Sequence, residues 1–227
     1  MFFYNDPTFL LLIPAMLLAF YAQWKVKSTY EKYSKVACSR GYTGAQVARY
    51  ILDDYRMQNI SVEPTPGELT DHYDPTKHKL CLSQSVYDSN SVAAIGVAAH
   101  ETGHAIQDSK SYAPLKLRNG LVPVTNLGTT LAFPLFIVGM FANMPQLMDI
   151  GIIFFSLAVV FSIITLPVEF NASARAIRVL ADGRFLTDKE LPMAKAVLNA
   201  AAMTYVAATT MAVLNLARLL MLRNQRD

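Results

Sequence analysis

The composition of this 227-residue chain differs from that of an ordinary water-soluble domain. Hydrophobic residues make up 53% of it and charged residues only 16%, whereas about a quarter of a typical soluble domain is charged. This apolar excess excludes an intrinsically disordered chain and predicts a protein that folds in lipid. The formal net charge of +3 is too small to favour nucleic-acid binding, and two cysteines, Cys38 and Cys81, are too few for a disulfide framework.

Four uncharged apolar stretches are long enough to cross a bilayer, which takes roughly 20 helical residues. The first, 7–24, lacks the basic start and the cleavage site of a secretion signal, so we expect a retained membrane helix. The second, 119–148, predicts a helix to about Phe141 followed by a turn, and it pairs with the third, 150–168, as a transmembrane hairpin. The fourth, 196–217, either spans or packs as a core helix that does not cross fully.

Basic residues orient these helices, because Lys and Arg are enriched in cytoplasmic loops. Five of them follow the first helix in 25–40 and three precede the second in 110–118, but none lies in the turn at 141–149. We therefore expect the region between the first two helices, and the segment after the third, to face the cytoplasm. A spanning fourth helix would place Arg223 and Arg226 outside, against this rule.

The roughly ninety residues after the first helix are enough for a small domain. Thr43 and Gln46 form a capping box that begins an amphipathic helix reaching Met57. Prolines and a glycine predict a loop at 64–67, and 71–75 is expected to be a turn.

A strand and a second helix follow in the same region. Residues 79–86 have the short, partly alternating pattern of a strand. Ser89 or Ser91 then caps a helix rich in alanine and valine that runs to about Asp108. This last helix carries the residues that suggest chemistry.

His100, Glu101 and His104 form an HExxH motif in that helix. Histidines four residues apart lie on one helix face, so both imidazoles can bind one tetrahedral zinc ion. Glu101 is placed to act on a zinc-bound water without being a ligand. The approach to the motif, 91–99, is almost wholly apolar, so these polar side chains enter a buried face and need partners there. The alternative is a pair of ordinary helix histidines.

A catalytic zinc site typically uses three protein ligands, and the third is expected downstream. Glu169 directly follows the third apolar run, where a carboxylate is costly unless it is paired or ligated. It is either this third ligand or a solvated glutamate in the first turn of a helix, where Glu is favoured. Asp108 and Glu190 are the other carboxylates available, in less apolar settings.

Four segments together resemble one protein family. The resemblance is to the YugP-type membrane zinc metallopeptidases, bacterial proteins distantly similar to the HtpX heat-shock protease, and it covers nearly the whole chain. It implies a gluzincin in the bacterial cytoplasmic (inner) membrane, with one zinc ion per chain. The segments that carry the resemblance are DHYDP (71–75), LCLSQSV (80–86), SVAAIGVAAHETGHAIQ (91–107) and PVEFNAS (167–173).

The resemblance also assigns roles to residues. It implies that His100 and His104 bind the zinc ion and that Glu169, on a second helix, is the third ligand. It further implies that Glu101 is the general base of peptide-bond hydrolysis. Zinc lowers the pKa of its bound water and polarises the scissile carbonyl, while the base takes the water proton and returns it to the leaving amine.

Two details of this site stay open. HtpX-like enzymes carry an aspartate four residues after the ligand glutamate, where this chain has Ser173. The hydrogen bond to a zinc-binding imidazole is therefore expected to be weaker, or to come from Asn171. The group that stabilises the oxyanion is normally Tyr, His or Arg. Tyr205 is slightly favoured over Arg175 and His72, because a tyrosine in an apolar helix needs a hydrogen-bond partner. The alternative, which the sequence favours more, is that Tyr205 only packs in the helix with its hydroxyl at the interface.

The expected partners are the lipid bilayer and a polypeptide substrate, with no nucleic acid. The two halves of the site flank the hairpin, so the zinc ion should lie at the cytoplasmic face, where segments or tails of membrane proteins are suitable substrates. A membrane-protein partner or a second copy of the chain is compatible with this arrangement. The strand at 80–83 either holds an extended substrate by edge pairing or only covers the catalytic helix.

Two other classes of function, a membrane scaffold and a transporter, are alternatives to a peptidase. In a non-catalytic membrane scaffold, the same ligands would hold a structural zinc ion that pins two helices together. Such a site is closed by a fourth ligand, commonly Cys, and neither Cys38 nor Cys81 is adjacent to the motif. A transporter is disfavoured because the apolar runs contain no charged residue that would mark an ion path.

The predicted fold is a mostly α-helical integral membrane protein with three to four apolar helices and a small zincin-like unit that contains a short β element. The expected domains, in chain order, are an N-terminal transmembrane helix (1–24), a cytoplasmic zincin-like region with the HExxH helix (25–118), a transmembrane hairpin (119–168), a helix with the third ligand and a cytoplasmic segment (169–195), and a C-terminal apolar helix with a basic tail (196–227).

Overall fold

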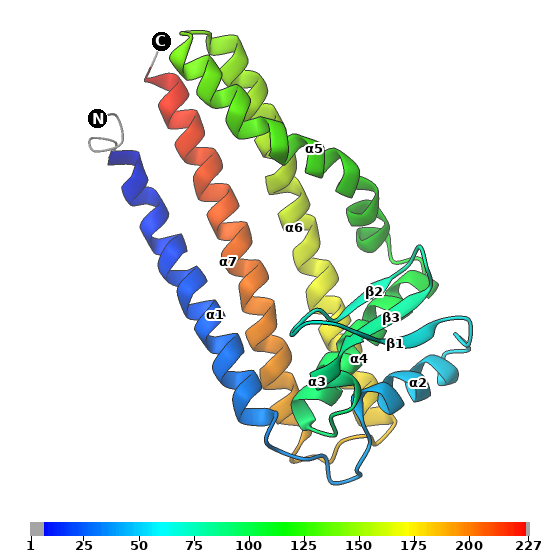
Figure 1. Cartoon of the computed structure of the whole chain (residues 1–227). Helices are drawn as coiled ribbons and strands as arrows, with labels where there is room; N and C mark the ends of the chain where they lie inside the picture. Colours follow the sequence, from blue (N-terminus) through cyan, green and yellow to red (C-terminus); the bar gives the residue numbers. More distant parts are fainter. Residues whose placement is uncertain (1–6, 226–227) are drawn as a thin grey trace. The chain divides into compact units, whose positions relative to one another are not determined.

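The computed structural model describes residues 7–225, which form a mostly helical fold (Figure 1). Residues 1–6 of the predicted first membrane helix and Arg226 of the predicted basic tail lie outside the described residues. The elements, in chain order, are a 3-10 helix (Pro7–Leu12), α1 (Ile13–Tyr33), α2 (Gly44–Asp54), β1 (Ser61–Thr65), β2 (His72–Asp74), β3 (Lys79–Ser83), α3 (Gln84–Tyr87), α4 (Val92–Ser109), α5 (Ala113–Phe141), α6 (Pro145–Asp182) and α7 (Leu191–Asn224).

The chain divides into two compact units, each with a hydrophobic core. Unit one contains the described residues up to Gln23, Lys116–Pro167 and the described residues from Met203 onward. Unit two contains Trp24–Leu115 and Val168–Ala202. The assignment of the five predicted ranges to membrane and cytoplasm stays a prediction.

Four helices are long and apolar enough to cross a membrane, namely α1 with the 3-10 turn before it, α5, α6 and α7. α1 with its 3-10 turn, α6 and α7 each contain one of the four apolar runs, and α5 ends at Phe141 inside the second run, as predicted. Several of the helices extend beyond the runs. α6 continues past Val168 to Asp182, and α7 begins at Leu191 rather than at Ala196. A charged side chain ends an apolar run without ending a helix, because the helix continues as long as its backbone hydrogen bonds do.

In unit one, α5 and α6 form the predicted hairpin. The turn between them contains Asn143, whose φ of +52° is a left-handed conformation that asparagine tolerates. The two helices approach closely at a glycine, since a Cβ atom on Gly151 would lie 2.7 Å from the carbonyl oxygen of Ala132. Small residues at such contacts are typical of helices that pack within a membrane.

The C-terminal helix of unit one ends beside the α5–α6 turn. The Nε atom of Arg223 lies 2.8 Å from an oxygen of Asp149, near the start of α6. Earlier in α7, the guanidinium group of Arg218 lies over the ring of Phe9 and donates a hydrogen bond to Thr8. α7 therefore runs to the same end of unit one as the turn, and Arg223, which the charge rule disfavours there, is paired with Asp149.

In unit two, the predicted helix starts are confirmed. Thr43 and Gln46 form both hydrogen bonds of a capping box at the start of α2. The hydroxyl of Ser91, rather than that of Ser89, caps α4 by accepting a hydrogen bond from the N–H of Ala94. The α4 helix ends at Ser109, one residue beyond the predicted end.

The sheet of unit two differs from the prediction. Its three strands lie in the order β1-β3-β2, with β1 parallel and β2 antiparallel to β3. β3 is therefore central, and the prediction of an edge strand at 80–83 is wrong. The loop predicted at 64–67 starts inside β1, which tolerates Pro64 because it is an edge strand. The turn predicted at 71–75 contains β2, and residues 84–87 form α3 instead of extending the strand.

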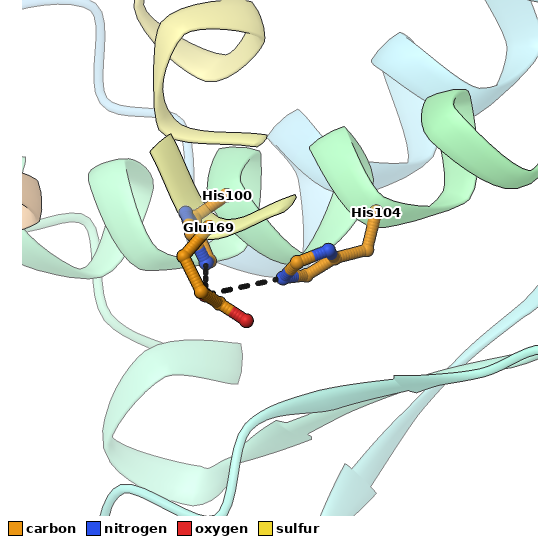
Figure 2. Close-up of side chains that lie close together, drawn as sticks. All are labelled: His100, His104 and Glu169. Atoms are coloured by element: carbon orange, nitrogen blue, oxygen red, sulfur yellow. Dashed lines mark hydrogen bonds and ion pairs between the residues drawn. The ribbon is translucent and has the colours of Figure 1, made fainter. Parts of the chain in front are cut away.

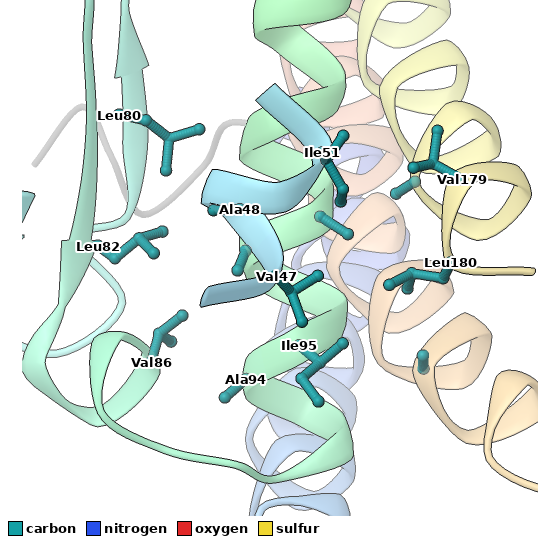
Figure 3. Close-up of a cluster of buried hydrophobic side chains, with 14 of the residues drawn as sticks. Val47, Ala48, Ile51, Leu80, Leu82, Val86, Ala94, Ile95, Val179 and Leu180 are labelled. Atoms are coloured by element: carbon teal, nitrogen blue, oxygen red, sulfur yellow. The ribbon is translucent and has the colours of Figure 1, made fainter. Parts of the chain in front are cut away.

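The core of unit two is built around α4 (Figure 3). Alanines and a few larger aliphatic residues cover this helix, so α2, α3, β3 and the end of α6 can all pack close to it. Dense packing of this kind holds the HExxH helix in a fixed position. The side chains labelled in Figure 3 are Val47, Ala48, Ile51, Leu80, Leu82, Val86, Ala94, Ile95, Val179 and Leu180.

Glu190 joins the loop at Ser39 to the start of α7 within unit two. Its carboxylate accepts hydrogen bonds from the N–H and hydroxyl groups of both Ser39 and Thr187, at 2.7 to 2.8 Å. Burial would raise the pKa of this carboxyl, but the hydrogen bonds from Thr187 and Ser39 lower it from 4.5 to about 2. The ionised carboxylate therefore stabilises the fold.

We expect Glu190→Gln to destabilise the protein by about 2 kcal/mol at pH 7, because the donors lose a charged acceptor. The contribution of an acid whose pKa is lowered by folding is present above pH 4.5 and is lost as the pH falls toward 2. Thermal unfolding of the full chain in detergent should show that the difference in melting temperature between wild type and variant disappears over that pH range. Asp188→Asn, at an exposed neighbouring position, is the control. A difference in stability between wild type and Glu190→Gln that does not change with pH would contradict this role of Glu190.

Candidate metal centre

His100 and His104 lie one turn apart on α4, and Glu169 lies within α6 (Figure 2). The Nε2 atoms of both imidazoles face the Oε2 atom of Glu169, which is 3.2 Å from His100 and 3.6 Å from His104. Two ligands bound about 2.0–2.1 Å from a tetrahedral zinc ion are about 3.3 Å apart. Both distances from the Glu169 carboxylate are therefore close to the spacing of zinc ligands, and all three ligand atoms lie within 4.8 Å of one another.

The close approach of α4 and α6 depends on a glycine. A Cβ atom on Gly103 would lie 2.7 Å from the carbonyl oxygen of Ala172, which is shorter than an ordinary contact. Glycine thus lets the two backbones approach closely enough for Glu169 to reach the histidines. Because the side chain of Glu169 is only 4% exposed and lies inside a helix, it is not a solvated glutamate in a first turn.

A hydrogen-bond chain fixes the protonation of His104. The Nε2 atom of Gln107 donates to the carbonyl oxygen of Val168 at 2.8 Å and to Oδ1 of Asn171 at 3.1 Å. The Oε1 atom of Gln107 must therefore be an acceptor, and the Nδ1 atom of His104, 3.0 Å away, must carry the proton. In the neutral imidazole, the lone pair of Nε2 then points at the carboxylate of Glu169, and two acceptors need a cation between them.

Ser173 holds the other imidazole. Its hydroxyl oxygen lies 3.1 Å from the Nδ1 atom of His100, which leaves Nε2 to face Glu169. Asn171, the alternative considered from the sequence, contacts Gln107 instead. Each histidine therefore has its own supporting residue, as is usual for metal-binding imidazoles.

The charge balance of the cluster favours a cation. The side chains of His100 and His104 are 14% and 11% exposed. Burial alone would lower the pKa of His104, but the carboxylates of Glu169 and Glu101 and the contact with Gln107 hold it above its ordinary value. The same carboxylates would stabilise a divalent metal ion at the Nε2 atoms.

Glu101 is buried next to this cluster without a protein donor. The residue is 9% exposed, and its carboxylate accepts no hydrogen bond from any residue between 7 and 225. A carboxylate that is left uncommitted beside a metal ligand set is suited to hold a water molecule and to take a proton from it.

The other candidates from the sequence have different contacts. Asp108 accepts a hydrogen bond from the hydroxyl of Tyr73 at 3.0 Å, and Glu190 has the contacts described above. His72 is exposed on β2, and the Nε atom of Arg175 donates to Asn171 at 2.7 Å. Neither carboxylate joins the metal cluster in the described part of the chain.

Tyr205 lies on α7 in unit one and is 38% exposed, so its role toward the oxyanion stays a prediction. Gln107 is the residue that sequence reasoning missed. Its position three residues after His104, on the same face of the helix, was the available signal.

Two buried imidazoles and a carboxylate, with a free carboxylate beside them, define the class of the protein as a metal-dependent hydrolase with long apolar helices. The family model described as "Putative neutral zinc metallopeptidase" matches residues 8–224. The chain is 49% identical over 218 residues to the "Putative membrane protease YugP" of Bacillus subtilis (strain 168). The aligned region covers 96% of this chain and 97% of that protein. The chain therefore belongs to this family of zinc metallopeptidases and is a membrane protein. No solved structure matches it.

Gly103→Ala should weaken zinc binding at least tenfold, because the new methyl group would push α4 and α6 apart. Zinc affinity of the full chain in detergent can be measured by competition with a fluorescent chelator. Gly96→Ala, on the same helix, is the matched control, since its Cβ would meet nothing closer than the Cβ of Ala194 at 3.4 Å. Equal affinities in the two variants would contradict the packing argument.

Gln107→Leu should lower zinc affinity about 10- to 100-fold, because His104 loses the acceptor that orients its ring. Gln107→Glu keeps an acceptor for the Nδ1 proton and should recover part of the loss. The same chelator competition measures both variants, with the exposed Gln58→Leu as control. Unchanged affinity in Gln107→Leu would show that His104 needs no such support.

Proposed function

We propose that the protein is a zinc-dependent endopeptidase of gluzincin type that cleaves membrane or membrane-proximal proteins. One observation carries this proposal, namely the convergence of His100 Nε2, His104 Nε2 and Glu169 Oε2 within 4.8 Å of one another. Three protein ligands with a fourth position left for water are typical of catalytic zinc sites.

Each residue of the site would have its own role in the hydrolysis. A bound zinc ion would supply a Lewis acid that lowers the pKa of water and polarises a carbonyl oxygen. His100, His104 and Glu169 would hold that ion, and the contacts with Ser173 and Gln107 keep the imidazoles aimed at it. The Glu101 carboxylate would take the proton of the attacking water and deliver it to the leaving amine.

The sheet suggests how a substrate chain binds. β2 rather than β3 is the edge strand that contacts α4. The hydrogen bond from Tyr73 to Asp108 fastens this strand one turn beyond His104 on the metal-binding helix. An extended peptide could add to the free edge of β2, where main-chain hydrogen bonds would hold it straight.

We further propose that the site faces the cytoplasm from the inner membrane of a bacterial cell. The basic residues that follow α1 and precede α5 support this orientation. Within unit one, the end of α7 lies beside the α5–α6 turn, which has no lysine or arginine between Phe141 and Asp149. On this topology, the chain would present Glu169 just after the third crossing, where cytoplasmic segments of membrane proteins are within reach.

The structural-zinc scaffold has less support. A structural site is normally closed by four protein ligands, and no fourth Cys, His, Asp or Glu of residues 7–225 joins the cluster. Cys38 and Cys81 are both absent from it.

Glu101→Gln should reduce peptide hydrolysis by about 100- to 10,000-fold, because the variant keeps the shape of the side chain but cannot accept the proton. Zinc content should stay at one ion per chain. Cleavage of an unfolded protein and of a membrane protein by the detergent-purified full chain, together with metal analysis, measures both quantities.

Glu68→Gln, at an exposed position, is the matched control and should keep full activity. An equally active Glu101→Gln variant would exclude this residue as the base. A zinc-loaded wild type that cleaves neither substrate while a second protein co-purifies in fixed ratio would instead favour the scaffold.

A further inference from the structure

Unit two contains a cavity of about 490 Å³ that shares no residue with the metal centre. It lies between the C-terminal part of α2 and the end of α6, and its size falls in the roughly 300–1,000 Å³ range of ligand sites. Ile51 and Val179, both part of the core in Figure 3, belong to its lining. The other lining residues are Tyr42, Tyr50, Asp54, Tyr55, Asp182, Gly183 and Phe185.

Three aromatic rings form one wall of this cavity. The rings of Tyr42 and Tyr50 have centroids 5.6 Å apart, and Phe185 lies 5.9 Å from Tyr42 and 6.3 Å from Tyr50. At these distances the rings pack directly against one another, so a ligand meets their outer faces rather than a space between them. Tyr50 is 53% exposed, so part of its ring is accessible from outside the protein.

Two carboxylates also line the cavity. Asp54 ends α2 and Asp182 ends α6, and neither forms an ion pair or a side-chain hydrogen bond with any residue between 7 and 225. The neighbouring Asp53 differs, because it pairs with Arg49 at 2.8 Å. Within residues 7–225, the one cation that lies over a lining ring is Lys110, whose Nζ atom is 5.4 Å from the centroid of Tyr55. Of the other three rings, Tyr50 is the one that is mostly exposed and open to a ligand.

We propose that this cavity binds the guanidinium group of an arginine that a polypeptide partner presents. A planar cation can stack on an aromatic face and at the same time offer paired N–H donors to a carboxylate, which a compact ammonium group cannot do. The aromatic wall and the two carboxylates match these two properties. The volume exceeds what one planar group fills, so residues next to the arginine would enter as well.

The test measures binding of a labelled six-residue peptide of alanine and serine with one central arginine. The protein is the full chain in detergent, in the Glu101→Gln background so that the peptide stays intact. We expect the counterpart with citrulline, which has the same shape without the charge, to bind at least tenfold more weakly. Asp54→Asn combined with Asp182→Asn should weaken binding of the arginine peptide at least tenfold, and Tyr50→Leu should weaken its binding as well.

Asp53→Asn is the matched control, because it removes an adjacent carboxylate that does not line the cavity, and it should leave binding unchanged. Equal binding of the arginine and citrulline peptides, or no effect of the paired aspartate change, would overturn the proposal. Free ethylguanidinium should compete only weakly with the labelled peptide for the cavity. If it competed as strongly as unlabelled peptide does, the proposal that a polypeptide supplies the guanidinium group would be overturned. Binding should survive Glu169→Ala, which separates this proposal from that of the metal centre.

Discussion

A buried carboxylate that faces two imidazole nitrogens is the constraint on which unit two depends. The Gln107 amide requires the Nδ1 atom of His104 to carry a proton, so in the neutral imidazole the Nε2 lone pair points at Glu169. Two acceptors in a buried place repel one another unless a cation lies between them. A proton can act as this cation between two of the atoms, but a tetrahedral metal ion would bind all three ligand atoms at once. The arrangement of α4 and α6 is therefore intelligible as a preformed metal site.

The rest of unit two holds these side chains still. Gly103 allows the helices to approach, the alanine-rich α4 packs on every side, and Ser173 fixes the ring of His100. A metal ion gains most from ligands whose positions are set before it binds, because little ordering is then needed. The same rigidity holds Glu101, whose carboxylate accepts no hydrogen bond from residues 7–225, beside the cluster where it can bind water.

The sequence predicted the parts of this protein that depend on local patterns. The spacing of His100 and His104, the capping box at Thr43 and the apolar runs each indicate a structure that short-range physics determines. The helix ends of α6 and α7 were misplaced because charge marks the edge of lipid, not the end of a helix. The sequence predicts β3 as an edge strand because its neighbours, β1 with a proline and the three-residue β2, are too irregular or too short to give a pattern. Gln107 was missed because its role depends on contacts with α6, which no local pattern reports.

X-ray absorption at the zinc edge of the purified full-length protein tests the ligand set most directly. We predict a first shell of two imidazole nitrogens and oxygen ligands at about 2.0–2.1 Å, and the loss of bound zinc in Glu169→Ala. A shell that contains sulfur at about 2.3 Å, or a zinc spectrum that Glu169→Ala leaves unchanged, would contradict it.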